Sequence, residues 1–354
     1  MNHHAYERGG LPAELARAAE ITLSPDLYSR ARTRGLSLSG LLEELDPSGP
    51  GAALDAFERQ LALAGIRVAG PQADAIDRFF ASAENAVLFP EYVSRAVRAG
   101  MSDFSKLDKI TATRTKIDDD TYRTLYMDDS VYAEGELSLA RVSEGAAMPR
   151  IEIKTAEHSI TLSKYGRYIE TTYEAIRRKK APVVEVFLRS IGMQIQKDKF
   201  REALSVLISG DGNDNAAPVD PVETDETLTY PDLIQFSLAF APYELSVLVA
   251  DATTAALILN LDEFKHPEVA RGLQTRGEMI TPLGATLIVD DSAPANKIVG
   301  LDRRFALEEV YETGVLIESD RLIRQQIEGT AISEVAGFGK LVTSACRVLN
   351  LDIS

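Results

Sequence analysis

One stretch, from Lys164 to Asn213, carries most of the information about the architecture of this chain: KYGRYIETTYEAIRRKKAPVVEVFLRSIGMQIQKDKFREALSVLISGDGN. From Val183 to Ser209 apolar residues recur at helical spacing, and Gly210 follows as a stop. About 27 residues in one helix give a rod of roughly 40 Å. We expect a buried stripe made of Val184, Phe187, Leu188, Ile191, Ile195, Phe200, Ala203, Leu204 and Leu207.

The region before this helix, residues 103–168, has the character of β-strands. It is rich in Thr, Val, Tyr and Ile, and apolar residues alternate at Ile151 and Ile153 and again at Ile160 and Leu162. Acidic runs such as Asp118-Asp119-Asp120 interrupt it. These features predict an extended hairpin. Because an isolated hairpin cannot bury both of its faces, we expect another subunit to cover it.

The first part of the chain, residues 11–84, is predicted to be a string of short helices. Ser24 is the expected N-cap of one helix, with Pro25 at its first position, and a second helix covers Leu38 to Leu45. The run PSGPG at 47–51 predicts a linker, and a third helix is expected over 52–64. We interpret this part as a helical subdomain, with a partner-binding or scaffolding arm as the alternative.

The remaining elements alternate between helix and strand. A helix is expected over 85–101, opening at Pro90 and stopping at Gly100. After the long helix, residues 211–232 carry seven acidic and no basic residues, which indicates a surface loop. Residues 232–314 then have α/β character. We expect helices in this region over 232–240 and 251–259. We also expect strands over 245–249, 286–289, 297–301 and 307–311. A strand over 315–318 and short strands over 331–351 close the chain.

Charge and composition exclude several classes of protein. The chain of 354 residues has 38 basic and 54 acidic side chains, a net charge of −16, whereas nucleic-acid-binding proteins present a basic face. A single cysteine excludes an intrachain disulfide or a cysteine zinc site, and four histidines make no His-rich site. No apolar run approaches the roughly 20 residues that span a bilayer. We therefore expect a soluble protein.

Phosphate-binding motifs fail on inspection. A P-loop would need a glycine where Glu334 stands, and Gly339-Lys340 is followed by leucine instead of Ser or Thr. The dinucleotide pattern G-x-G-x-x-G starts at Gly210 and at Gly337, but neither run ends in glycine. No cofactor is expected.

Catalytic and metal motifs fail as well. The serine-hydrolase pattern is incomplete at Gly35–Ser39, and Cys346 lies in an apolar context that predicts a buried structural thiol. The run starting at Asp211 resembles a calcium loop but lacks its glycine and its final glutamate. His158 and His266 are isolated in the sequence. We expect no catalytic residue and no metal site.

The basic run from Arg177 to Lys180 directly precedes the long helix and has two interpretations. It is a solvated patch, or it contacts an acidic surface of a neighbour or packaged nucleic acid. Cations oppose the dipole at the N-terminus of a helix, so an external anion would be a natural partner.

The order of elements resembles the major capsid proteins of tailed phages, the Hong Kong 97 fold family. The similarity lies in KYGRYIETTYEAIRR (164–178), in the long helix ending in SGDGN (209–213), and in PLGATLIVDD (282–291) followed by KIVGLDRRFALEEV (297–310). The ending GVLIESDRLIRQQIEGTAISEVAGFGKLVTSACRVLNLD (314–352) also resembles the closing strands of these proteins. The similarity runs from about residue 85 to the end and is spread over many positions.

The resemblance implies an α+β chain with a defined division. It has a helical N-terminal extension (1–84), an N-arm (85–111) and an extended β-hairpin loop, the E-loop (112–165). A peripheral domain (166–225 and 314–354) contains the spine helix (183–209), and an α/β axial domain covers 226–313. Some family members crosslink lysine to asparagine; Lys154 or Lys164 with Asn350 would be the candidates, although no local pattern supports them.

The resemblance also implies a structural function without enzymatic activity. The chain would assemble through pentamers and hexamers into an icosahedral head that encloses double-stranded DNA, contacting it non-specifically. Portal, scaffold and decoration proteins would be further partners, with assembly in the bacterial host cytoplasm and final location in the virion. An encapsulin-like nanocompartment shell and an enzyme with an α/β domain are the alternatives. The expected assembly contacts are Tyr122, Tyr126, Tyr132, Glu144, Arg150, Arg177, Arg178, Lys179 and Lys180.

Overall fold

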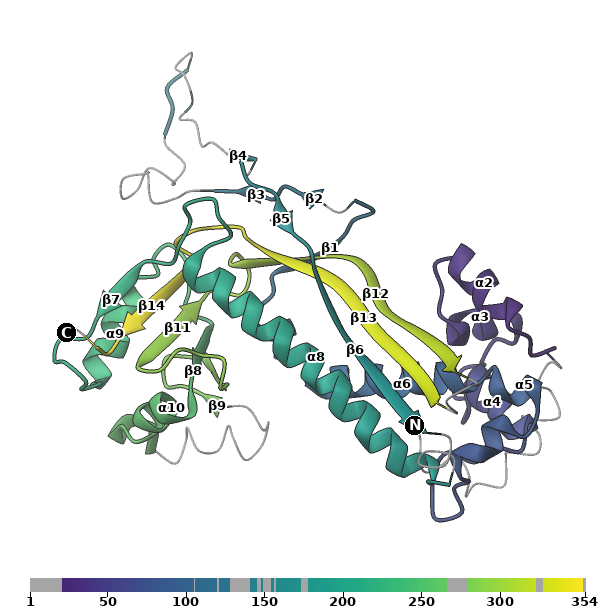
Figure 1. Ribbon diagram of the computed structural model, residues 1–354. Helices are drawn as coiled ribbons and strands as arrows, with labels where there is room; N and C mark the ends of the chain where they lie inside the picture. The colour runs from purple at the N-terminus through teal and green to yellow at the C-terminus, as the bar shows by residue number, and fades with distance from the viewer. Residues whose placement is uncertain are drawn as a thin grey trace. The chain divides into compact units, whose positions relative to one another are not determined.

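The computed structural model describes residues 21–104, 106–119, 121–127, 141–144, 148, 154–155, 157–172, 178–265, 279–322 and 327–352. The chain divides into two compact units. Unit 1 comprises residues 1–104, 166–195 and 315–333, and unit 2 comprises residues 105–165, 196–314 and 334–354. The longest helix, α8, is unbroken from Ala181 to Ser209 (Figure 1), so the division passes within it.

Unit 1 is mainly helical. Its elements before the long helix are α2 (Asp26–Thr33), α3 (Leu38–Leu45), α4 (Ala56–Leu63), η2 (Ile76–Phe80), α5 (Ala83–Ala86) and α6 (Phe89–Asp103). Two predicted helix starts were wrong. Pro25 occupies the N-cap of α2 and no side chain caps that helix, so Ser24 is not its cap. Helix α4 starts four residues later than expected, because Asp55 and Glu58 form a capping box there.

Helices α6 and α8 meet at two glycines within unit 1. A Cβ added at Gly192 of α8 would lie 2.1 Å from the carbonyl oxygen of Val97, and one at Gly100 would lie 2.0 Å from that of Arg189. The two backbones are therefore in direct contact, which no larger residue permits. Gly100 consequently sits inside α6, which continues to Asp103, and does not end it as the sequence suggested.

Unit 2 contains a six-stranded sheet in the order β7-β14-β11-β8-β10-β9. The strand bounds are β7 (Val219–Pro221), β8 (Val247–Ala250), β9 (Met279–Ile280), β10 (Thr286–Val289), β11 (Lys297–Leu301) and β14 (Cys346–Asn350). Strands β8 and β10 are parallel, whereas β11 runs antiparallel to both β8 and β14. Helices α9 (Tyr230–Leu238) and α10 (Ala252–Leu259) and the short η3 (Leu107–Lys109) and η5 (Asp262–Lys265) belong to the same unit.

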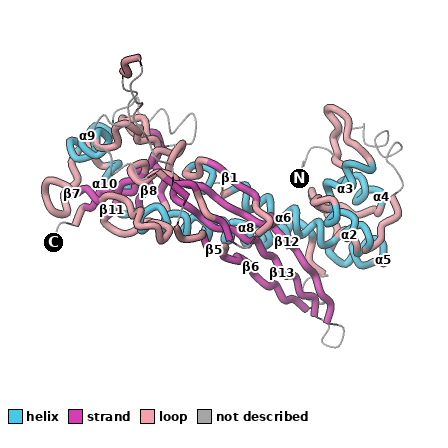
Figure 2. The backbone as a smooth tube through the Cα atoms, turned by 90° about the horizontal axis from the view of Figure 1, so that it is seen from above, coloured by secondary structure: helices cyan, strands magenta, loops and turns pink. Residues whose placement is uncertain are grey.

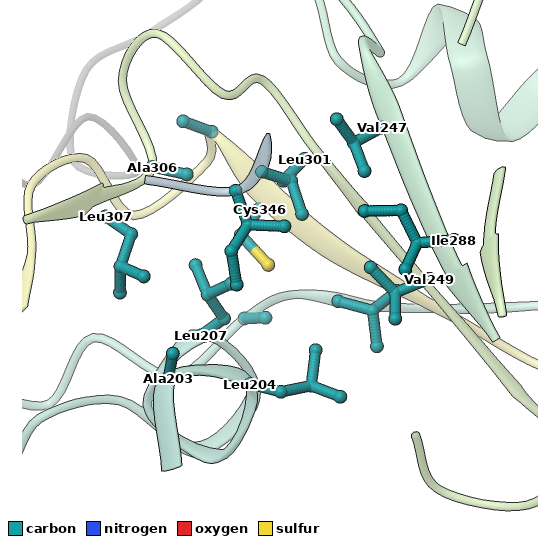
Figure 3. Close-up of a cluster of buried hydrophobic side chains, with 14 of the residues drawn as sticks. Ala203, Leu204, Leu207, Val247, Val249, Ile288, Leu301, Ala306, Leu307 and Cys346 are labelled. Carbon is teal, nitrogen blue, oxygen red and sulfur yellow. The ribbon is translucent and has the colours of Figure 1, made fainter. Parts of the chain in front are cut away.

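Both faces of this sheet are buried, and the alternation of β8 shows how. Val247 and Val249 face a core that includes Leu204 and Leu207 of α8, whereas Leu248 faces a second core with residues of α9 and α10. Figure 3 shows the first core, where the α8 side chains approach Cys346, Leu301 and Val249. The predicted burial of Leu204 and of the Cys346 thiol is confirmed.

A second, four-stranded sheet has the order β1-β12-β13-β6. Its strands are β1 (Thr113–Lys116), β6 (Ser163–Thr172), β12 (Leu307–Leu322) and β13 (Ile327–Lys340). The long strands β12 and β13 run side by side (Figures 1 and 2). The strands expected over 307–311 and 315–318 are therefore parts of the one strand β12, and the run expected as short strands over 331–351 is divided between the long β13 and β14.

Strand positions also revise the predicted acidic loop. The acidic loop 211–232 contains β7, which pairs with β14. Strand β14 therefore lies in the same sheet as β8, β10 and β11. The predicted helix over 183–209 is confirmed, with two additional residues at its start.

Replacing Gly192 by alanine tests the contact between α6 and α8. The new methyl group collides with the Val97 carbonyl, so we expect a loss of about 1–3 kcal/mol in the free energy of unfolding. Gly40→Ala in α3 is the matched control, because its Cβ would meet only side-chain atoms at 3.6 Å. Equal thermal stability of the two variants would contradict the close crossing.

Candidate assembly interface

One face of α8 in unit 1 exposes apolar side chains to solvent. Val183, Val186, Phe187 and Met193 lie on this face at spacings of three to four residues, together with Ser190. Phe187 is 67% exposed, whereas the next residue, Leu188, is 5% exposed. The predicted burial of Phe187 was therefore wrong, because α6 crosses α8 at Gly192, on the other side of the helix. We call this surface the apolar face of α8.

Segment 112–165 pairs with itself as the two legs of a hairpin. Strand β2 (Thr121–Tyr122) pairs antiparallel with β5 (Ile160–Thr161), and β3 (Leu125–Tyr126) pairs antiparallel with β4 (Lys154–Thr155). Leu125 is 58% exposed on one leg. The hairpin predicted from the strand-like sequence is thus present at its base, and its tip lies outside the described residues.

Two carboxylates hold the base of the hairpin against the rest of unit 2. The Thr115 hydroxyl donates to Glu308, and the Tyr122 hydroxyl donates to the same carboxylate at 3.4 Å. The hydroxyl of Tyr165 donates to Glu202 on α8. Burial and the Glu202 carboxylate raise the pKa of Tyr165, so its hydroxyl remains a donor at physiological pH.

The hairpin base also crosses β13 at very short range. A Cβ added at Gly339 would lie 2.4 Å from Thr124 Cγ2 and 2.6 Å from Ile160 Cδ1. Beyond this crossing, the Met127 amide donates to the carbonyl oxygen of Leu341 at 2.9 Å. Both legs of the hairpin are therefore fixed where they leave the body of unit 2.

A buried ionic cluster lies behind this base. The ammonium group of Lys199 is 2.7 Å from Glu309 Oε1 and 2.8 Å from Glu334 Oε1, and all three side chains are nearly inaccessible. Arg114 pairs with the other oxygen of Glu309 at 2.5 Å. These contacts join α8 to β1, β12 and β13. Burying these charges is costly unless they remain paired, so the cluster fixes the register of the strands on the helix.

Sequence inspection did not reveal the Lys199 cluster. It also did not reveal the crossing of α6 and α8 or the crossing of the hairpin base and β13. Lys199, Glu309 and Glu334 are far apart in the chain, so no local pattern connects them. Gly192 does carry a signal, because a glycine inside a long helix costs about 1 kcal/mol and therefore suggests a packing requirement.

The basic run ends in contacts with the segment before α5. Arg178, Lys179 and Lys180 are exposed, and Lys180 Nζ donates to the carbonyl oxygen of Pro71 at 3.2 Å. The first amide of α8, that of Ala181, donates to the carbonyl oxygen of Asp74 at 2.9 Å. A protein carbonyl therefore accepts from the first amide of α8, while the side chains of Arg178 and Lys179 stay exposed.

The other predicted contact residues are dispersed. Tyr122 and Tyr126 are half-buried on one leg of the hairpin, and Glu144 is exposed. Tyr132, Arg150 and Arg177 lie outside the described residues, as does His266. The crosslink candidates Lys154 and Lys164 belong to β4 and β6, whereas Asn350 ends β14.

Polar groups of the suspected calcium loop are engaged elsewhere. Asp211 Oδ2 accepts from the amide of Lys340 at 3.0 Å, and Asn215 Oδ1 accepts from the amide of Asp211 at 3.1 Å. The described residues contain no cluster of His, Cys, Asp and Glu suited to a metal ion.

Among the residues that the structure describes, no helix has the length and apolar character to cross a membrane. Burial raises the pKa of Cys346 to about 11, which keeps its thiol unreactive.

Comparisons with known proteins identify what this arrangement is similar to. A family described as phage capsid protein matches residues 155–342. The capsid of a native GTA particle superposes with a TM-score of 0.52 at 12% identity, over 70% of this chain and 89% of that one. This likeness establishes the fold. No match was found among curated protein sequences.

Two further solved structures show similar coverage. A virus-like particle from Pyrococcus furiosus has a TM-score of 0.48 at 15% identity, over 73% of this chain and 98% of that one. The capsid of cyanophage P-SCSP1u has a TM-score of 0.47 at 14% identity, over 69% and 87% of the two chains.

Replacing Lys199 by methionine tests the ionic cluster. The substitution leaves the buried Glu334 carboxylate without its cation, beside Glu309, which keeps only Arg114, so we expect a loss of about 3–5 kcal/mol in the free energy of unfolding. Arg201→Met is the control on the same helix. Its exposed pair with Asp198 contributes at most about 1 kcal/mol. Chemical denaturation of both variants measures the difference, and similar losses would refute the role of the cluster.

Proposed function

Because this chain belongs to the phage capsid protein family, we propose that it is the repeating subunit of a phage head and that its copies join through the apolar face of α8. The observation that supports this contact is the exposure of the apolar face. Four apolar side chains are exposed to solvent on a helix whose opposite side packs against α6 at Gly192. Covering them with a second copy removes that surface from water, which favours association by roughly 25 cal/mol per Å² buried.

We propose the hairpin of a neighbouring copy as the element that covers this face. Its described part exposes Leu125 and, further along, Met148, which is 79% exposed. A hairpin offers contact area without a large globular surface of its own. Its base is fixed by Glu308, Glu202 and the crossing at Gly339, so its direction is set before it meets a partner. Pre-ordering reduces the entropy lost on association.

The division of the chain follows the same proposal. Residues 112–165 would be the extended loop, 166–225 and 314–354 a peripheral domain around α8, and 226–313 an axial domain. Both faces of the six-stranded sheet are covered within the subunit, so the axial domain would contact others through its edges and loops. Pentamers and hexamers would then form around the symmetry axes of an icosahedral shell, where heterologous contacts close into rings.

The proposed role is structural and assigns no catalysis to the chain. Its net charge of −16 keeps free subunits soluble and limits tight binding to the enclosed double-stranded DNA. Arg178 and Lys179 are exposed and would give local, non-specific contacts to that DNA or to an acidic neighbour. Portal, scaffold or decoration proteins would be additional partners, with assembly in the cytoplasm of the bacterial host.

The substitution Phe187→Asp tests the apolar face directly. It places a charge where a partner must bury its side chain, so we expect a folded subunit that no longer forms closed particles. Ser205→Asp, at another exposed position of α8, is the control and should assemble normally. Size-exclusion chromatography with negative-stain microscopy measures assembly. Closed shells from the Phe187 variant would rule the interface out.

Deleting residues 120–150 tests the hairpin. Because this segment contributes contacts and little of the core, we expect a soluble, folded subunit with cooperative thermal unfolding that fails to close shells. If the shortened chain still assembles into closed particles, the hairpin is not the covering element.

A further inference from the structure

Residues 21–88, which we call the N-terminal module, have a core continuous with α6. Leu41, Leu42, Phe57 and Phe79 are fully buried. The ring of Phe79 packs against Phe89 and Tyr92 of α6, with ring centroids 5.6 and 5.3 Å apart. Without the module, these aromatic side chains of α6 would lose their cover.

The module also binds the first turn of α8. The Ala181 amide donates to Asp74 O at 2.9 Å, and the Ile76 amide donates to Lys179 O at 2.9 Å. The Tyr92 hydroxyl of α6 donates to Ala181 O at 2.7 Å. A helix leaves its first amides without partners inside the helix, so the module supplies a bond that α8 cannot make itself.

Buried charges connect the module to α6 as well. Glu91 of α6 is 3% exposed, and its Oε1 accepts from the Ser39 hydroxyl at 2.6 Å and from the Ser39 amide at 3.2 Å. Arg95 of α6 pairs with Asp55 at 2.5 Å and lies over the Phe57 ring, 5.0 Å from its centroid. Without the module, the Glu91 carboxylate would lose both hydrogen bonds from Ser39. It would then either stay partly buried without these donors or become exposed together with the aromatic side chains of α6.

We infer that the N-terminal module is a permanent part of the shell subunit, which holds the start of α8 and covers α6, and is not a scaffold that leaves after assembly. The module bonds to the start of α8 and covers α6, and α6 packs the side of α8 that bears Gly192, so the apolar face stays free for a partner. A removable scaffold would instead meet the subunit through a surface that is stable in water when bare. The buried aromatic and charged contacts of α6 do not form such a surface.

The inference rests on the proposed function only for the step of assembly, so its test begins with the free subunit. The recognition sequence of a specific protease is inserted at Pro50, in the exposed turn between Gly49 and Gly51, where no other atoms are close. After cleavage, we expect the fragment with α2 and α3 to co-elute with the remaining chain until denaturant is added. A fragment that separates from the subunit in native buffer would overturn the inference.

The same cut subunits are then assembled and washed. We expect the fragment to remain in the shells at one copy per subunit, measured by gel densitometry and mass spectrometry. Intact shells that have lost the fragment would overturn the inference while leaving the proposed function in place. If no preparation forms shells, the proposed function fails, and co-elution with the free subunit still decides whether the module is integral.

A matched pair of variants shows that retention depends on the contacts described. Ser39→Ala in the cut subunit removes the hydroxyl bonded to Glu91, so the fragment should dissociate at a lower denaturant concentration than in the parent. Ser29→Ala, at an exposed position of α2, should leave the midpoint unchanged. Identical midpoints for both variants would mean that the Glu91 contact does not hold the module.

Discussion

The structure depends on one requirement: a long helix with apolar side chains on more than one side must be covered along its length. Helix α8 meets this requirement differently in its two halves. Its second half packs Leu204 and Leu207 onto the six-stranded sheet. Its first half is approached by α6 so closely that only Gly192 fits the crossing. Apolar side chains that neither neighbour reaches, Phe187 foremost, remain exposed and, in the assembly we propose, supply the driving force for association.

Rigidity at a few points makes such an interface usable. Lys199 ties α8 to β12 and β13 through two buried carboxylates, and a one-residue slip of either strand would leave charges buried without partners. The carboxylates of Glu308 and Glu202 then fix the hairpin base, because they accept hydrogen bonds from hydroxyl groups of that segment. Since a shell repeats each contact many times, weak contacts suffice if every subunit presents the same geometry. In the assembly we propose, the polar clusters keep the geometry uniform, whereas the apolar face supplies the affinity.

Much of this fold could be predicted because local patterns encode it. The period of apolar residues predicted α8, and short strand-like runs predicted β10 and β11 to the residue. Burial of Phe187 was predicted wrongly, because periodicity shows which residues are apolar but not which side a neighbour covers. The lengths of β12 and β13 were hidden by polar residues along them. The Lys199 cluster and the six-stranded sheet that takes in β7 and β14 arise only when distant segments meet.

The most direct test of the central claim is the accessibility of position 187 in free subunits and in shells. The only native thiol, Cys346, is fully buried, so a Phe187→Cys variant has one reactive site. A maleimide reagent should label it rapidly in dissociated subunits and at least tenfold more slowly in assembled shells, because a neighbouring copy covers the apolar face. Equal labelling rates in the two states would contradict the account, since they would leave this face in solvent after assembly.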